Sequence, residues 1–215
     1  MSLDDWILPI QVVVEGLVDE AIADRLLREI GIPGDRYIIS VRGGRAKIMS
    51  KLQNYNYAAS RQPWVIFMDL DNDECAPSLI ARYLPSPNAG MCLRVAVREV
   101  ESWIMADPTH LANFLGLSPS VVPTSPDAEE DPKLKLLQLA RRSRRRDIRE
   151  DLVVERNGTL REGPAYAGRL QRFVREEWDV QRAAERSDSL LRCIRGLQRW
   201  KQRVFLSSPT SPPSL

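Results

Sequence analysis

The sequence predicts an α/β fold, in which a mostly parallel four-stranded sheet is flanked by helices and followed by an α-helical extension. Three observations support this prediction. Short β-branched or apolar runs alternate with amphipathic segments through the first half of the chain, a Pro-rich acidic segment interrupts the pattern, and helical periodicity continues after it. The length of 215 residues allows one large domain, or one domain with a helical extension.

Four apolar runs are the expected strands: "IQVVV" (10–14), "YIISV" (37–41), "WVIFM" (64–68) and "MCLRVAV" (91–97). In parallel sheets a site forms beyond the carboxyl ends of the strands, so the residues after each run are the first candidates for function. The segments between and after the strands have helical spacing of apolar residues. They are expected to form helices over 17–31, 46–59, 77–84, 101–107 and 108–117.

The second half of the chain is organised differently. A Pro/Ser/acidic loop, "SPSVVPTSPDAEEDP" (118–132), precedes three expected helices over 132–150, 165–185 and 187–206. The last segment, "SSPTSPPSL" (207–215), has the composition of a disordered tail. We therefore divide the chain into an α/β core (1–117), a linker loop (118–132), a basic helical extension packed on the core (133–206) and the tail (207–215).

Composition argues against several classes of protein. No run of about 18 apolar residues occurs, so no membrane span is expected, and the first residues lack the features of a secretory signal. The three cysteines are scattered and form no CxxC pair, which argues against zinc and favours reduced thiols in the cytoplasm. The only histidine, His110, has no surrounding pattern for a serine triad or a Cys-His pair. No pattern indicates an oligomeric state.

Charge is distributed unevenly along the chain. Residues 1–132 hold 11 Lys/Arg against 19 Asp/Glu, and residues 133–203 hold 20 against 10. This asymmetry predicts a carboxylate site beside a surface that attracts phosphates. The strongest basic segment, "ARRSRRRDIR" (140–149), is expected to be helical and to hold a nucleic-acid backbone without reading its sequence. Its candidate contacts are Arg141, Arg142, Arg144, Arg145 and Arg146.

The alternative for this basic segment is a solvated helix. Its arginines would then pair with nearby acidic residues, namely Glu150, Asp151 and Glu155.

The stretch "VIFMDLDNDECAP" (65–77) places three aspartates, Asp69, Asp71 and Asp73, at alternate positions after an apolar strand. Carboxylates this close repel one another, and a cation would remove the repulsion. An EF-hand loop is excluded, because its glycine position holds Glu74 and its bidentate glutamate position holds Ile80. A haloacid-dehalogenase-type phosphatase is a weaker alternative, because its Asp-x-Asp motif normally follows the first strand of the fold.

Three motifs, taken together, resemble the Toprim (topoisomerase–primase) domain. "VVVEGLVDE" (12–20) is similar to the family's strand ending in Glu-Gly, "VRGG" (41–44) to the glycines after its second strand, and "FMDLDND" (67–73) to its Asp-x-Asp motif. The motifs occur in the family's order, and the resemblance covers about residues 10–107. "VREVESWIMAD" (97–107), "DPKLKLL" (131–137) and 177–197 also resemble an uncharacterised bacterial Toprim-like family. That family is related to RloB-like and OLD-type nucleases, which are often associated with phage defence.

The resemblance implies a Toprim-like core and a function in phosphodiester cleavage. It makes Asp69 and Asp71 ligands of Mg²⁺ or Mn²⁺, and Glu15 a further ligand or general acid/base. Asp73 and Glu101 are candidate ligands of a second ion, and Lys133 matches a lysine that would contact nucleic acid. A separate ATPase is the implied partner, since the chain has no GxxxxGK[ST] loop.

Residue chemistry is compatible with this expectation. Side chains two apart on an extended segment point the same way, so Asp69 and Asp71 would share one cation. Glu15 would then accept a proton from the attacking water or return one to the leaving oxygen. The structural alternatives are helix-start roles for Glu15, Asp19 and Asp73. The rival class of function is a non-catalytic, metal-binding module that binds a partner protein or nucleic acid.

Overall fold

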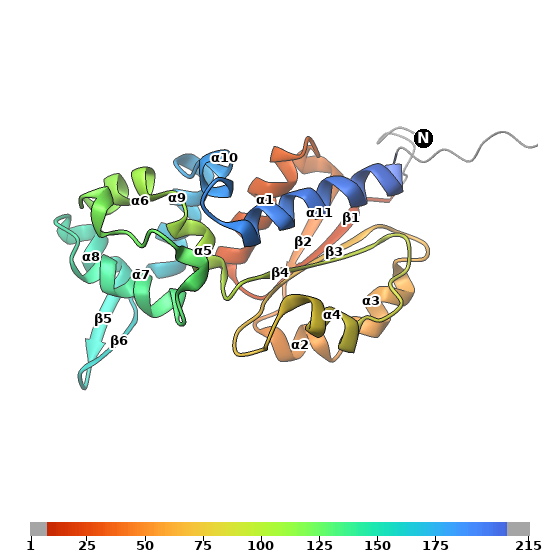
Figure 1. Cartoon of the computed structure of the whole chain (residues 1–215), viewed down its shortest axis with the longest axis horizontal. Coiled ribbons are helices and arrows are strands. Elements are labelled where there is room, and N and C mark those ends of the chain that lie inside the picture. Colours follow the sequence, from red (N-terminus) through yellow and green to blue (C-terminus); the bar gives the residue numbers. More distant parts are fainter. Residues whose placement is uncertain (1–7, 206–215) are drawn as a thin grey trace, which may run out of the picture.

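The computed structural model describes residues 8–205 and confirms the α/β fold (Figure 1). Four strands form one sheet in the order β2-β1-β3-β4, and every neighbouring pair is parallel. All four expected strands are present within a residue of their predicted ends. They are β1 (Ile10–Val14), β2 (Tyr37–Val41), β3 (Trp64–Asp69) and β4 (Met91–Ala96).

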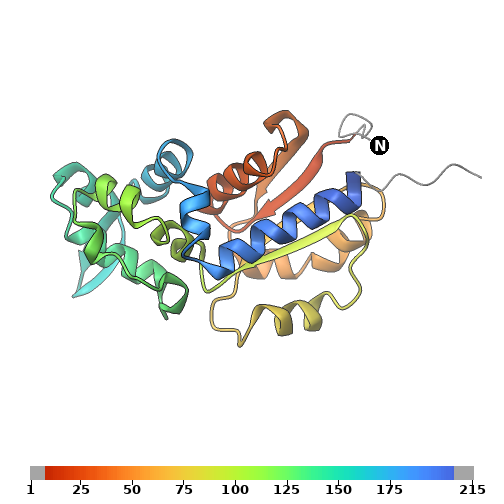
Figure 2. The same cartoon turned by 45° about the horizontal axis from the view of Figure 1, so that its top comes forward.

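The two central strands are buried on both faces, as a parallel sheet requires. Val12 of β1 packs in the same hydrophobic cluster as helices α1 and α11, whereas the neighbouring Val13 packs against α2, α3 and α4. Figures 1 and 2 show the same layers, with α1 and α11 on one face of the sheet. The helices are α1 (Leu17–Glu29), α2 (Arg45–Met49), α3 (Leu52–Ala58), α4 (Ala76–Tyr83) and α11 (Asp188–Phe205), with a short 3₁₀ turn, η2 (Gly34–Arg36), before β2.

A second lobe lies at the carboxyl end of the sheet (Figure 1). It follows β4 and precedes α11, which returns to run alongside β4 (Figure 2). Its elements are α5 (Val100–Met105), α6 (Pro108–Leu115), η3 (Pro119–Val121), η4 (Pro126–Ala128), α7 (Pro132–Arg141), α8 (Arg146–Leu152), β5 (Val153–Arg156), β6 (Thr159–Glu162), α9 (Tyr166–Glu176) and α10 (Val180–Ala184).

One hydrophobic cluster connects this lobe to the α1 face of the sheet. Trp103, Trp178 and Trp200 are buried in it, and each indole N–H donates a hydrogen bond inside the protein. A single hydrophobic core runs through both parts of the molecule. The domain division at residue 118 stays a prediction. None of the described helices combines the length and the apolar character that a membrane span needs.

The structure corrects several predicted helices. The helix expected over 132–150 is broken between α7 and α8, because the buried Ser143 hydroxyl donates to the Leu115 carbonyl at 2.6 Å and accepts from Arg145 N–H. The helix expected over 165–185 is likewise divided, since Asp179 caps a new helix at α10. The segment 46–59 forms two short helices, α2 and α3.

Two further expectations concern the second half of the chain. The antiparallel β5–β6 hairpin was not predicted, and it interrupts the extension that we expected to be helical throughout. The predicted disordered tail, 207–215, lies outside the described residues.

Candidate functional site

The order of the strands creates a crevice at the carboxyl end of the sheet. The chain leaves β1 toward β2 on one side, whereas β3 and β4 lie on the other side. Such a switch point between two central strands is where open α/β sheets bind ligands. Glu15 follows β1 and Asp69 ends β3, so both lie at this crevice. They are in direct contact, because Glu15 Oε1 accepts the Asp69 N–H at 3.0 Å.

A glycine pair holds the backbone of Glu15 in place. The N–H groups of Gly43 and Gly44 donate to the Glu15 carbonyl at 2.9 and 3.2 Å. Both glycines have positive φ, +71° and +113°, which residues with a Cβ adopt only at a cost. The "VRGG" motif therefore fixes the glutamate that follows the neighbouring strand.

Two more acidic side chains join Glu15 and Asp69. Asp19 comes from α1 and Glu101 from α5, and both are buried. We call Glu15, Asp19, Asp69 and Glu101 the carboxylate cluster. Burial is the largest cause that raises the pKa of Asp69 well above its ordinary value, and the charges of Asp19, Glu101 and Glu15 raise it further. Burial also raises the pKa of Glu15. The cluster is therefore short of positive charge.

Asp19 provides the clearest sign of this shortage. Its Oδ2 accepts the Gly16 N–H at 3.2 Å, but its Oδ1 is buried and has no hydrogen-bond partner. Burial, followed by the charges of Glu101 and Glu15, raises the pKa of Asp19 to about 7. Buried oxygens without a partner are rare and costly in folded proteins. The sequence marks Asp19 only as an acidic residue in the first turn of a helix.

The second lobe forms the other wall of the site. Glu101 Oε1 accepts the Tyr166 hydroxyl at 3.0 Å, and Lys133 Nζ lies 3.7 Å from the same oxygen. Lys133 also forms an ion pair with Glu162 at 3.2 Å. Burial alone would lower the pKa of Lys133, but the charges of Glu101 and Glu162 raise it. A pocket of about 260 Å³ lies among these groups, Asp19 and Asp69.

The other two predicted ligands point elsewhere. The strand ends at Asp69, and Asp71 has φ +50°, so the extended geometry expected for 69–71 does not continue. Asp71 forms an ion pair with Arg45 at 3.3 Å, and Asp73 pairs with the same guanidinium. Asp71 still lies near enough to Glu15 for its charge to raise the pKa of that glutamate. Arg45 therefore holds Asp71 and Asp73 in ion pairs beside the carboxylate cluster.

The cluster has the donor chemistry of a site for a hard divalent cation. Mg²⁺ and Mn²⁺ prefer carboxylate oxygens, and the unpartnered Asp19 Oδ1 is an oxygen that a cation would satisfy. Within residues 8–205, no group of three or more His, Cys, Asp or Glu side chains is arranged to hold a metal ion. Binding would therefore require the carboxylates to draw together around the ion.

Two of the five arginines of the predicted basic segment are ion-paired. Arg141 pairs with Glu155 at 3.3 Å and Arg146 with Glu150 at 2.7 Å, as in the solvated-helix alternative. Arg145 donates to the Phe114 carbonyl at 3.4 Å. The five arginines also do not lie around one helix, because the chain breaks between α7 and α8. Arg142, Arg144 and Arg145 form no ion pair with a described residue.

A second basic surface, which the sequence prediction does not include, lies on α11. On α11, Arg192, Arg195, Arg199 and Arg203 recur at intervals of three and four residues and are exposed, so they share one face. We call these four residues the α11 arginine stripe. No acidic residue occurs between 189 and 205. Only Arg192 of the stripe has an ion-pair partner among the described residues, Asp188 at 2.7 Å.

Comparison of the chain with family models, with curated proteins and with solved structures finds no match in any of the three. The Toprim resemblance therefore stays a prediction from the three motifs.

Proposed function

We propose that this protein is a Mg²⁺-dependent nuclease of the Toprim type that cleaves phosphodiester bonds in DNA or RNA. The observation that carries the proposal is the buried, unpartnered Asp19 oxygen among four carboxylates at the switch point of the sheet. The order of the Glu-Gly, Gly-Gly and Asp-x-Asp motifs supports the same conclusion. A cytoplasmic location, a role in phage defence and a separate ATPase partner belong to this proposal as expectations.

Asp69, Glu15 and Asp19 are the residues that would hold the ion, with Glu101 beside them. A bound Mg²⁺ would polarise a phosphate and lower the pKa of a bound water. Arg45 already supplies positive charge to Asp71 and Asp73. We therefore propose one ion in the carboxylate cluster, in place of the two that the motif comparison allows.

Glu15 is the residue that would move the proton. Its Oε1 accepts the Asp69 N–H at 3.0 Å, which holds the carboxylate at the crevice. Its raised pKa brings it closer to neutral pH, where a general acid or base works best. Lys133 would neutralise Glu101 and stand beside the substrate phosphate, because its ammonium lines the same pocket.

The α11 arginine stripe is the surface that we propose for the nucleic-acid backbone. Its helix starts beside the carboxyl end of β4, where Ser189 Oγ accepts the Val97 N–H at 3.0 Å. From Arg192 to Arg203 the stripe extends about 16 Å along α11. Arginine forks suit phosphate oxygens and need not read the bases.

Replacing Glu15 with Gln tests the proposal. The substitution keeps the size and the Asp69 hydrogen bond of the side chain but removes its proton transfer. Cleavage of a panel of single- and double-stranded DNA and RNA, measured with Mg²⁺ or Mn²⁺, should fall by about 100-fold or more, while the melting temperature changes little. Glu176→Gln, on the exposed end of α9, is the matched control and should keep full activity.

A non-catalytic metal-binding module is the second candidate function. The observation that favours it is Arg45, which occupies the carboxylates that a second ion would use. If the unmodified protein binds Mg²⁺ or Mn²⁺ but cuts no nucleic acid, even together with the products of neighbouring genes, this second function replaces the first.

A further inference from the structure

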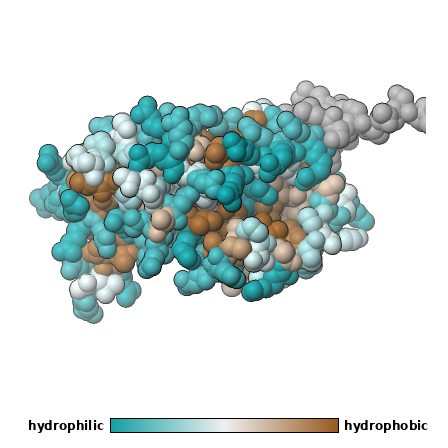
Figure 3. Space-filling view, viewed as in Figure 1, coloured by the Kyte–Doolittle hydropathy of each residue, from teal (hydrophilic) through white to brown (hydrophobic). Residues whose placement is uncertain are grey.

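A pocket of about 470 Å³ lies between β4, α4 and α11, and no member of the carboxylate cluster lines it. In the view of Figure 3, apolar side chains are visible between the mainly hydrophilic surfaces of α11 and α4. Most of the lining is apolar, which is typical of small-molecule sites. It includes Leu70, Ala76, Ile80, Val95 and Val97.

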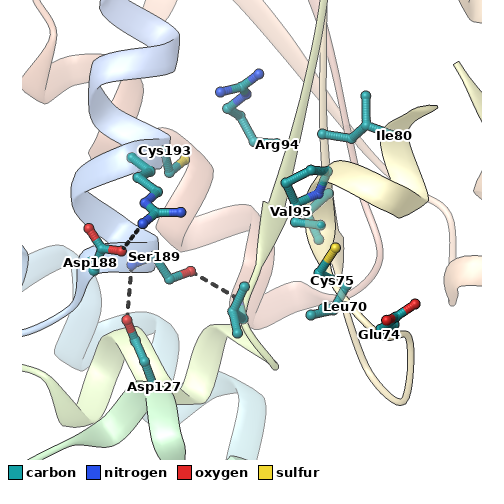
Figure 4. A pocket seen from close by; sticks show the side chains of 14 residues that line it. Leu70, Glu74, Cys75, Ile80, Arg94, Val95, Asp127, Asp188, Ser189 and Cys193 are labelled. Carbon is teal, nitrogen blue, oxygen red and sulfur yellow. Dashed lines mark hydrogen bonds and ion pairs between the residues drawn. The ribbon is translucent and has the colours of Figure 1, made fainter. Parts of the chain in front are cut away.

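Arg94 of β4 is the unusual member of this lining. Its guanidinium lies between Cys193 on α11 and Ile80 on α4 (Figure 4). The side chain is partly buried, and its Nε donates to the Leu93 carbonyl at 2.6 Å. No acidic side chain within residues 8–205 forms an ion pair with it. A partly buried charge without a counter-ion is costly, because the interior screens it poorly.

The fold keeps space for this guanidinium. Gly196 is buried in the middle of α11, where glycine is unfavourable relative to alanine. A Cβ on Gly196 would lie 1.8 Å from Arg94 Nη1. Glycine therefore occupies the position on α11 where a larger side chain would clash with the Arg94 guanidinium.

The neighbouring groups do not neutralise Arg94. Burial raises the pKa of both adjacent thiols, Cys92 and Cys193, so both are uncharged near neutral pH. Asp188 pairs with Arg192 at 2.7 Å, and Asp127 accepts hydrogen bonds from the Ser187 hydroxyl and the Ser189 N–H. The third acidic residue of the lining, Glu74, forms no ion pair with Arg94, and Figure 4 shows all three acidic groups away from the Arg94 guanidinium.

We propose that this pocket binds a small amphipathic carboxylate. Its anionic group would pair with the Arg94 guanidinium, and its apolar body would lie against Ala76, Ile80 and Val95. One arginine fork matches the two oxygens of a carboxylate, whereas a phosphate dianion would need more donors than these apolar walls supply. The proposal does not depend on the nuclease function.

Titration calorimetry with sodium octanoate on the full chain tests this site. Wild-type protein should bind octanoate, and Arg94→Met should weaken that binding about ten- to a hundredfold. Arg82→Met, at an exposed position of α4 outside the pocket lining, is the matched control and should leave the affinity unchanged. Two further ligands separate the contributions: 1-octanol lacks the charge and inorganic phosphate lacks the apolar body, so both should bind at least about tenfold more weakly.

Gly196→Ala provides a second test that changes no charge. Its methyl group takes the place of Nη1, so the guanidinium must move and octanoate should bind more weakly. The melting temperature without octanoate shows whether each variant folds. Absence of octanoate binding to the wild type, equal binding of octanol or phosphate, or unchanged affinity in both the Arg94 and Gly196 variants would each overturn the proposal.

Discussion

Asp19 shows how one residue can serve a helix and a candidate site at the same time. Its Oδ2 accepts the Gly16 N–H and so supports the start of α1, which is the role that its position in the sequence predicts. Its Oδ1 has no partner and lies beside other carboxylates. A helix-capping role explains one of the two oxygens, and a cation would explain the other.

Asp19→Asn separates these roles. The amide oxygen can still accept the Gly16 N–H, but the negative charge is lost. Without metal at about pH 8, the variant should be at least as stable as the wild type, because the repulsion from Glu15 and Glu101 is removed. Mn²⁺ should raise the melting temperature of the wild type and raise that of Asp19→Asn much less, because a ligand stabilises the state that it binds.

Asp35→Asn, in the η2 turn away from the cluster, is the control for this experiment and should respond to Mn²⁺ as the wild type does. An equal Mn²⁺ response in Asp19→Asn would remove Asp19 from the metal site.

Residue patterns predicted part of this site. Glu15 and Asp69 were expected from the spacing of acidic residues after apolar strands, and the structure brings them into contact. Asp71 and Asp73 have the same spacing, but Arg45, which lies 26 and 28 positions away in the sequence, pairs with both. Spacing identifies acidic residues that lie at the same strand end. It does not identify a cation such as Arg45, which only the tertiary fold brings next to them.

Elements were predicted best where local pattern and tertiary packing agree. The four strands have continuous apolar runs, and the structure buries the two central strands, β1 and β3, on both faces. The α7–α8 break depends on the Ser143 hydroxyl reaching the Leu115 carbonyl, a contact between residues 28 positions apart. No local signal in the sequence indicates such a contact, so the 132–150 pattern predicts one helix.

The α11 arginine stripe gives the test at this scale. If it holds phosphates, each lost contact should reduce the dependence of binding on salt, by about 0.9 in the slope of log K against log salt for duplex DNA. Arg195→Ala combined with Arg199→Ala should therefore flatten the slope by roughly 1.8. Binding is measured in EDTA, so that cleavage does not interfere.

Arg141→Ala combined with Arg146→Ala removes the same charge from the originally predicted basic segment. Both of these arginines are ion-paired, so the slope should change by less than half as much. A larger change in the salt slope for this double variant than for the α11 double variant would show that residues 140–149 form the nucleic-acid surface.

At the scale of the whole molecule, the carboxylate cluster couples folding to pH. Burial places Asp19 and Asp69 where the protonated form is favoured, and the pKa of both is raised. Lys133 and Arg45 are the cations that face the cluster, and each is already shared with other carboxylates. The folded chain therefore holds protons that the unfolded chain releases at lower pH.

The sign of the effect follows from this difference. The ordinary pKa of an aspartate is 3.8, and that of Asp19 in the folded protein is about 7. The contribution of Asp19 to stability is complete below pH 3.8 and is lost as the pH rises to about 7, with a slope of at most about 1.4 kcal/mol per pH unit. Without metal, the free energy of unfolding should thus fall between about pH 4 and 7, and Asp19→Asn should flatten this fall.

Magnesium should act in the opposite direction. Because the ion binds the ionised carboxylates, it should raise the free energy of unfolding more at about pH 8 than at pH 5, and so flatten the profile of the wild type. Urea unfolding at the two pH values, with Mg²⁺ or with NaCl of equal ionic strength, measures both effects. A profile that is flat without metal, or a Mg²⁺ effect that is equal at both pH values, would show that the cluster does not carry the charge shortage on which a metal site depends.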